Sequence, residues 1–237
     1  MYKLIQLLVR KETLTHEEFL EHWQNACEGI THLKGLKQYR TVLPTTPESA
    51  EFDGIAELHF ETVESLHDAL GTEGTWNFST HRETVADDRD DSGDFLQAET
   101  VQSIVGKEVI EKDEVDGETD GLYKHSAFLD RKEGMSQEAF FEYWADEHAP
   151  IAREVPGVVR YVRVIPTSPE RAAFDGVAEL YFESLDALRA ALGHESSRDY
   201  APDNPAAKAL REDAENLHSI DGRPRFIGTE FVQIDRI

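Results

Sequence analysis

The chain contains the same sequence twice. Residues 43–71 align with residues 165–193 without a gap and are identical at 17 of 29 positions, where chance would give roughly 2. Trp23 recurs as Trp144, a shift of 121 residues (144 − 23), and Tyr39 recurs as Tyr161, a shift of 122 (161 − 39). We therefore place one extra residue of the second copy near Pro156. A repeat this long is a duplicated domain and not a solenoid unit of about 20–50 residues. Residues that the copies share are expected to serve the fold, and residues that differ are candidates for function.

The duplication divides the 237 residues into two domains. We expect a first repeat at residues 1–110 and a second repeat at residues 122–237, because units of about 110 residues fit the usual domain size. Residues 111–121, which join them, are acidic and poor in apolar side chains. This composition is typical of a flexible tether.

Each copy predicts the element order β-α-β-β-α-β. Apolar residues 4–9 indicate a first strand, and Thr15 with Glu18 forms a capping-box pattern that begins a helix, as Ser136 does in the second copy. In the second copy, this helix carries an apolar stripe made of Phe140, Trp144, His148 and Ile151. The later elements of the second copy are expected at residues 158–165, 176–182, 185–192 and 226–234, and the last strand of the first copy at residues 95–109.

This order predicts an α+β fold. A split β-α-β unit of this kind leaves one sheet face beneath the helices and the other face bare. Two such sheets bury their bare faces either by packing face to face or by closing into a barrel. Because both sheets belong to one chain, we expect an intramolecular pseudo-dimer, with further oligomerisation left open.

The charge of the chain restricts its partners. Asp and Glu outnumber Lys and Arg by 48 to 24, which gives a net charge of −24. Such a field repels phosphate groups, so we expect neither nucleic acid nor an anionic membrane as a partner. The acidic residues are spread over both copies, with a dense run at residues 87–91. This pattern favours a halophilic protein, in which concentrated cations screen the repulsion, over an acidic mesophilic one.

Two further features concern the compartment. No apolar run reaches the roughly 18 residues that a membrane helix needs, and residues 2–9 are too short and too polar for a signal peptide. Cys27 is the only cysteine, so no internal disulfide is possible. We expect a cytoplasmic protein.

A motif in the second copy resembles a known family. Its helix contains Trp144-x-x-x-His148-Ala149-Pro150, which Pro156-Gly157, Tyr161 and Phe174-Asp175-Gly176 follow. These residues resemble the EthD-like family of dimeric α+β barrel proteins. The resemblance implies two ferredoxin-like (βαββαβ) repeats packed as an intramolecular dimeric α+β barrel, with a cleft between sheet and helices. Relatives in the wider superfamily include cofactor-free monooxygenases, isomerases, polyketide cyclases and haem-binding chlorite dismutases, so the resemblance implies a fold more than a reaction.

His148 is the candidate catalytic residue. Aligned from the helix start, it stands where the first copy has Cys27, and an imidazole can transfer protons near neutral pH. The alternative is a core histidine bonded to a carbonyl or a carboxylate. Four residues are candidates for substrate binding. They are Trp144 and Tyr161, which both copies share and for which a role in the core is the favoured alternative, His125, which replaces Leu4, and Asp213, which lies where the family has an acidic residue according to the resemblance.

Other chemistries lack their motifs. The chain has no GxGxxG or Walker loop and no HxxxH or CxxC pair, so we expect no bound organic cofactor and no metal. The favoured function is a cofactor-independent, oxidoreductase- or isomerase-type enzyme, monooxygenase-like, which acts on a small hydrophobic or aromatic compound in a cleft of the second repeat. The alternatives are a non-catalytic ligand-binding or stress-associated barrel and a haem-binding barrel with His148 as axial ligand.

Overall fold

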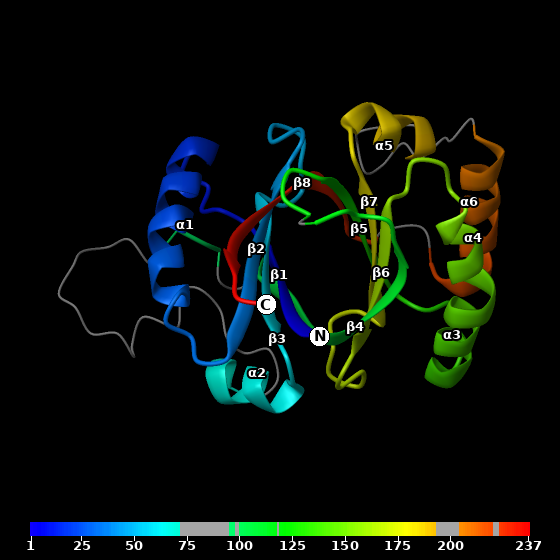
Figure 1. Cartoon of the computed structure of the whole chain (residues 1–237), viewed down its shortest axis with the longest axis horizontal. Helices are drawn as coiled ribbons and strands as arrows, with labels where there is room; N and C mark the ends of the chain where they lie inside the picture. The colour runs from blue at the N-terminus through cyan, green and yellow to red at the C-terminus, as the bar shows by residue number, and fades with distance from the viewer. Residues whose placement is uncertain (72–94, 98–99, 118, 193–203, 220–222) are drawn as a thin grey trace.

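The strands of the described residues form one closed barrel (Figure 1). The structure, a computed structural model, describes residues 1–71, 95–97, 100–117, 119–192, 204–219 and 223–237. The strands are β1 (Tyr2–Leu8), β2 (Leu36–Pro44), β3 (Gly54–Phe60), β4 (Gln102–Asp113), β5 (Tyr123–Leu129), β6 (Arg160–Pro166), β7 (Gly176–Phe182) and β8 (Arg225–Asp235). The helices are α1 (His16–Ile30), α2 (Val63–Leu70), α3 (Gln137–Tyr143), the π-helical turn η4 (Trp144–His148), α4 (Ala149–Arg153), α5 (Leu185–Leu192) and α6 (Pro205–Leu217). The predicted α+β class is confirmed.

The barrel closes because the last strand of each repeat pairs with one strand of its own repeat and one strand of the other. Around the barrel the order is β1-β3-β2-β8-β5-β7-β6-β4, and β4 returns to β1. Strand β8 pairs with β2, and β4 pairs with β6, in both cases antiparallel. Of the two ways to bury the bare faces, the chain therefore uses closure, which leaves no free sheet edge.

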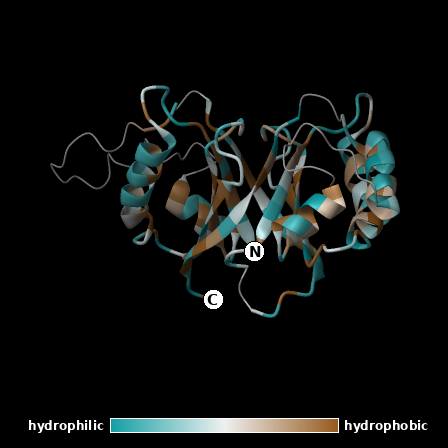
Figure 2. Cartoon of the chain, turned by 90° about the horizontal axis from the view of Figure 1, so that it is seen from above, coloured by the Kyte–Doolittle hydropathy of each residue, from teal (hydrophilic) through white to brown (hydrophobic). Residues whose placement is uncertain are grey.

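The helices of the two repeats cover opposite sides of the barrel. Helices α1 and α2 lie on one side, and α3 to α6 lie on the other (Figures 1 and 2). Alternation along the strands separates an outer apolar layer beneath the helices from an inner one. In β1, for example, Leu4 and Leu8 belong to the outer core, whereas Ile5 and Leu7 belong to the inner core. No helix of the described part of the chain has the length and apolar character to span a bilayer.

Features that both repeats share serve the fold, as expected. Thr15 forms the predicted capping box with Glu18, and Ser136 caps the equivalent helix by accepting a bond from the N–H of Ala139. Gly54 and Gly176 are needed for close packing, because a Cβ atom at either position would lie 2.4 Å from the indole ring of Trp23 or Trp144.

Two predicted boundaries are wrong, and both concern β4. The strand begins at Gln102, so residues 95–97 precede it, and it continues to Asp113, so residues 111–113 belong to it and not to the tether. The acidic residues stay in the strand because β6 supplies partners: Arg163 donates to Glu111 at 2.7 Å, and Arg160 donates to Asp113 at 2.6 Å. The acidic run at residues 87–91 lies outside the described residues.

The extra residue of the second repeat lies in a helix and not near Pro156. Ile30 and Ala152, at the ends of the two equivalent helices, are both buried and differ by 122 in residue number. The same holds for Leu33 and Val155, so the extra residue comes before Ala152. Helix α1 is a regular α-helix, whereas its counterpart contains the π-turn η4, and a π-turn holds one more residue than an α-turn. Cys27 therefore corresponds to Ala149 (149 − 27 = 122), and His148 stands in the widened turn. Such turns occur frequently at functional sites.

Candidate active site

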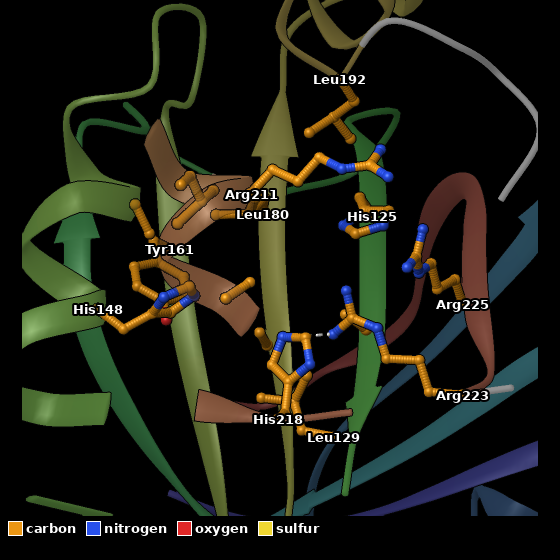
Figure 3. A pocket seen from close by; sticks show the side chains of 15 residues that line it. His125, Leu129, His148, Tyr161, Leu180, Leu192, Arg211, His218, Arg223 and Arg225 are labelled. Carbon is orange, nitrogen blue, oxygen red and sulfur yellow. Dashed lines mark hydrogen bonds between the residues drawn. The ribbon is translucent and has the colours of Figure 1, made fainter. Parts of the chain in front are cut away.

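A pocket in the second repeat lies between the outer face of the barrel and the helices (Figure 3). Its empty volume, including the open solvent at its mouth, is about 620 Å³. Much of the wall is apolar and includes Ala127, Leu180 and Leu210. The polar lining residues are His125, His148, Tyr161, Arg211, His218, Arg223 and Arg225.

His148 and Asp213 form a hydrogen-bonded pair. The π-turn positions His148, and α6 positions Asp213, so that His148 Nδ1 lies 2.7 Å from Asp213 Oδ2. The other carboxylate oxygen accepts a bond of 2.6 Å from the Tyr143 hydroxyl. Because an ionised carboxylate only accepts hydrogen bonds, we assign the proton to Nδ1, which leaves the Nε2 lone pair available.

The surroundings keep His148 neutral near physiological pH. Burial lowers the pKa of His148, and the hydrogen bond and charge of Asp213 oppose this shift without cancelling it. The side chain is almost fully buried. A neutral imidazole with a fixed tautomer and a carboxylate partner has the properties of a general base.

His218 forms a second polar group beside His148. The two rings meet edge to face with centroids 6.3 Å apart. His218 Nδ1 lies 3.1 Å from the carbonyl oxygen of Ser219, so it donates there, and Nε2 accepts from Arg223 Nη1 at 2.9 Å. Burial and the neighbouring Arg223 lower the pKa of His218 to about 3. His218 is thus a neutral residue that fixes Arg223 against the pocket wall.

His125 is the most unusual polar residue of the pocket. It lies on β5, and its side chain points outward toward the helices, where the first repeat has Leu4. Its Nδ1 is buried and has no hydrogen-bond partner among the described residues. Burial, followed by the charges of Arg225 and Arg223, lowers its pKa to about 3. His125 is therefore neutral and has an unused hydrogen-bonding atom.

The structure gathers four of the five predicted residues at the pocket. His148, Tyr161 and His125 line it, and Asp213 bonds to His148 from α6. Trp144 is not among the described residues that line the pocket. It is fully buried in the core, and its Nε1 donates to the Tyr161 hydroxyl at 2.8 Å. The first repeat has the same bond between Trp23 and Tyr39 at 2.9 Å, which marks the pair as part of the fold.

Sequence analysis missed His218 and the three arginines. The first-repeat counterparts of His218 and Arg225 become clear only from strand pairing. Arg131 forms an isolated backbone β-bridge with His218, as Arg10 does with Leu96. In the strand ladders, Arg225 pairs with Ala127 of β5, and Ser103 pairs with the equivalent Gln6 of β1. Equivalent residues of the two repeats therefore keep a numbering difference of 122 beyond the well-aligned region (225 − 103; 218 − 96), and this difference could have identified them from the sequence.

The described residues contain no group of three or more His, Cys, Asp or Glu side chains arranged to hold a metal ion. Proton transfer by the His148–Asp213 pair is the chemistry that the pocket geometry supports directly.

Comparisons with known proteins agree with this architecture. A solved structure of an anthrone oxidase-like protein has a TM-score of 0.62 and 15% identity, and the match covers 99% of this chain and 92% of that chain. A mutant chlorite dismutase from Candidatus Nitrospira defluvii has a TM-score of 0.57 and 13% identity, with 97% and 90% covered. At such identities these likenesses show the fold alone.

No curated protein sequence matches the chain. The EthD domain family model matches residues 132–217, which include both His148 and Asp213. Residues 132–217, within the second repeat, are therefore similar to the EthD domain family, in a chain whose strands close into one barrel.

Proposed function

We propose that the protein is an oxidoreductase- or isomerase-type enzyme that removes a proton from a small hydrophobic or aromatic compound in the pocket of the second repeat. The observation that carries the proposal is the His148–Asp213 pair, with 2.7 Å between Nδ1 and Oδ2, in a largely apolar pocket. The proposal includes the scaffold: two ferredoxin-like repeats, the first ending with β4 at Asp113 and the second at residues 122–237, with only the second repeat active.

The first step is the same for both reaction types. Nε2 of His148 accepts a proton from the substrate, and Asp213 stabilises the imidazolium that forms. An isomerase returns this proton to a second atom of the substrate. A cofactor-independent monooxygenase instead transfers electrons from the substrate carbanion to dioxygen, which the solvent supplies. The name of the anthrone oxidase-like structural neighbour supports the second type by analogy of fold alone.

A ligand screen followed by matched variants tests the proposal. Small aromatic and ether compounds are screened by thermal shift, and hits are assayed for turnover with and without dioxygen. His148→Ala should lower turnover on the order of 10²–10⁴-fold, whereas Cys27→Ala, in the first repeat, should leave it unchanged. Equal effects of the two variants, with both proteins folded, would remove His148 from the mechanism.

Two other functions share part of this evidence. A barrel that only holds a ligand has the same pocket, and ligand binding without turnover of any hit identifies it. A haem-binding barrel is the third candidate, because a metal-ligating histidine usually donates its other N–H to a carboxylate, as His148 does to Asp213. The residues fit haem in this respect, and Nε2 of His148 would then bind the haem iron, which would supply redox chemistry to the pocket. The absorption spectrum after titration with haem separates this candidate from the other two.

A further inference from the structure

We propose that the ligand of this pocket is an apolar compound that carries a carboxylate, held at the part of the wall formed by His125, Arg223 and Arg225. This proposal rests on the proposed function, because it names the substrate class of the same site. It goes beyond it in stating which chemical group the pocket selects and which residues select it.

The first argument is the charge of the pocket wall. The described lining residues include Arg211, Arg223 and Arg225 and no Asp or Glu side chain. The nearby carboxylate of Asp213 is occupied by His148 and Tyr143. In a chain with a net charge of −24, a pocket with this lining is a local exception. The overall field repels anions, so these arginines are needed to hold an anionic ligand at this site.

The second argument is the unpaired nitrogen of His125. The side chain is 7% exposed, it lines the pocket, and its Nδ1 has no partner among the described residues. Leaving a buried polar atom unpaired is unfavourable unless a ligand completes the bond. Burial, followed by the charges of Arg225 and Arg223, lowers the pKa of His125, so both guanidinium groups lie close enough to His125 to interact with it. In Figure 3 the three arginine side chains are drawn around His125.

The third argument comes from the first repeat. At the positions equivalent to His125, His218, Arg223 and Arg225, the first repeat has Leu4, Leu96, Val101 and Ser103, respectively. Leu4 and Leu96 are completely buried in one apolar core, and Val101 packs against it. The fold is thus stable without any of these polar groups. Their presence in the second repeat alone indicates a ligand requirement and not a folding requirement.

These features together define the ligand. The guanidinium group of arginine binds the two oxygens of a carboxylate side by side, and a neutral His125 can add a hydrogen bond. The alanine and leucine side chains of the wall suit an apolar body. His148 lies across the pocket from Arg223 and Arg225 in Figure 3, so a carboxylate held there leaves the apolar body between the arginines and the base.

The test compares acids with their uncharged amides on the full chain. Isothermal titration calorimetry is carried out with 2-naphthoate and 2-naphthamide, and with benzoate and benzamide. We expect at least one acid to bind at least tenfold more tightly than its amide. Arg223→Val and Arg225→Ser, which introduce the first-repeat residues, should each reduce acid affinity about tenfold and leave amide affinity unchanged. Arg225→Gln, closer in shape, should do the same if Arg225→Ser does not fold.

His148→Ala separates this proposal from the proposed function. It should keep the ratio of acid to amide affinity, because the base does not select the charge. Acid binding that depends on the arginines, without any His148-dependent turnover, would retract the enzyme and keep the carboxylate site. Equal binding of acid and amide, a preference that survives the double arginine variant, or no binding of any acid would overturn the carboxylate site.

Discussion

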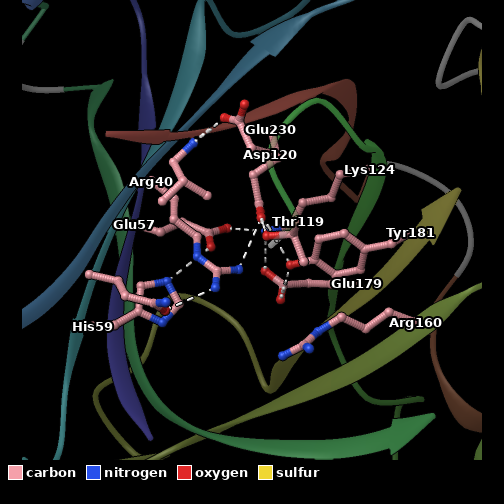
Figure 4. Close-up of polar contacts among 12 residues, drawn as sticks. Arg40, Glu57, His59, Thr119, Asp120, Lys124, Arg160, Glu179, Tyr181 and Glu230 are labelled. Carbon is pink, nitrogen blue, oxygen red and sulfur yellow. Dashed lines mark hydrogen bonds and ion pairs between the residues drawn. The ribbon is translucent and has the colours of Figure 1, made fainter. Parts of the chain in front are cut away.

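Lys3 Nζ lies 2.7 Å from Glu179 Oε2 inside the barrel, so a lysine of the first repeat is paired with a glutamate of the second. The reciprocal pair joins Lys124 of the second repeat to Glu57 of the first (Figure 4). All four side chains are completely buried. The two pairs correspond under the duplication (124 − 3 = 121; 179 − 57 = 122), and together they connect the two halves of the barrel.

The buried network extends to β8. Lys124 donates to Glu230 at 3.0 Å, and Arg40 donates to the same carboxylate at 3.0 Å. Burial disfavours the charge of Glu57, but Lys124 and Lys3 outweigh it and keep the pKa of Glu57 well below its usual value. Burial and the neighbouring Glu57 instead raise the pKa of Glu179. Glu179 is therefore the first of these carboxyl groups to take up a proton as the pH falls.

Removing one charged side chain from this buried network, while its partners stay, should lower the stability of the fold strongly. Lys3→Met leaves Glu179 and Glu57 with one buried cation fewer, and we expect a loss of about 3–5 kcal/mol in the free energy of unfolding. Denaturant unfolding measures it. Lys37→Met, which removes the exposed ion pair with Glu61, is the control and should cost less than about 1 kcal/mol. Similar costs for the two variants would show that the buried network has no special role.

The pocket histidines should make the protein sensitive to mild acid. His125 and His218 have pKa values of about 3 in the folded chain against 6.5 for an ordinary histidine. Between these values the unfolded chain binds more protons, so stability falls as the pH falls below about 6.5, by up to about 1.4 kcal/mol per pH unit for each histidine. Unfolding free energies from pH 7 to pH 5 measure this slope.

Replacing His125 by the first-repeat residue should reduce that slope. His125→Leu removes one of the two groups, and His218→Leu, with Leu96 as its counterpart, should remove a further part of similar size. Slopes that stay the same in both variants would mean that neither histidine is buried in its neutral form.

The sequence alone predicted the barrel better than it predicted the pocket. Shared residues such as Thr15 and Gly176 identify elements because capping and close packing impose local patterns. The extra residue could not be located, because aligned identities do not show whether a gap lies in a loop or in a helix, and only the π-turn resolves this. Arg225 and Ser103 become equivalent only when strand pairing sets their register. Periodicity places Trp144 on the inward face of its helix but does not give its depth, so the sequence leaves both a core role and a cleft role open.

The pH dependence of turnover should report His148. A general base must be neutral, so kcat/KM should fall as the pH decreases through the pKa of His148, which burial places below 6.5. Asp213→Asn removes the group that raises this pKa, so the acidic limb should move to lower pH. The plateau should fall on the order of 10²-fold, because the tautomer is no longer held. A limb that moves to higher pH would contradict the assigned role of Asp213.

Salt should stabilise the chain. With a net charge of −24, like charges repel one another in dilute buffer, and at 1 M salt the screening length shrinks to about 3 Å. We expect the Tm to rise steadily between 0.1 and about 2 M KCl. A Tm that is flat or decreases over this range would exclude a halophilic adaptation of the surface.

Shortening the π-turn by one residue should leave the protein folded but remove the His148–Asp213 hydrogen bond. Deletion of the exposed Asp146 gives the second-repeat helix the residue count of α1, which forms a regular α-helix around the corresponding Trp23. Since Trp144 and the core after Ala149 then match the first repeat, we expect a folded protein with native-like circular dichroism. His148 would take the position of Ala26 (148 − 122) and lose its hydrogen bond to Asp213, so turnover should fall at least as far as in His148→Ala. Asp146→Ala, which keeps the chain length, is the control and should retain turnover. A deletion variant that folds and keeps full turnover would show that the extra residue of the second repeat has no part in placing the base.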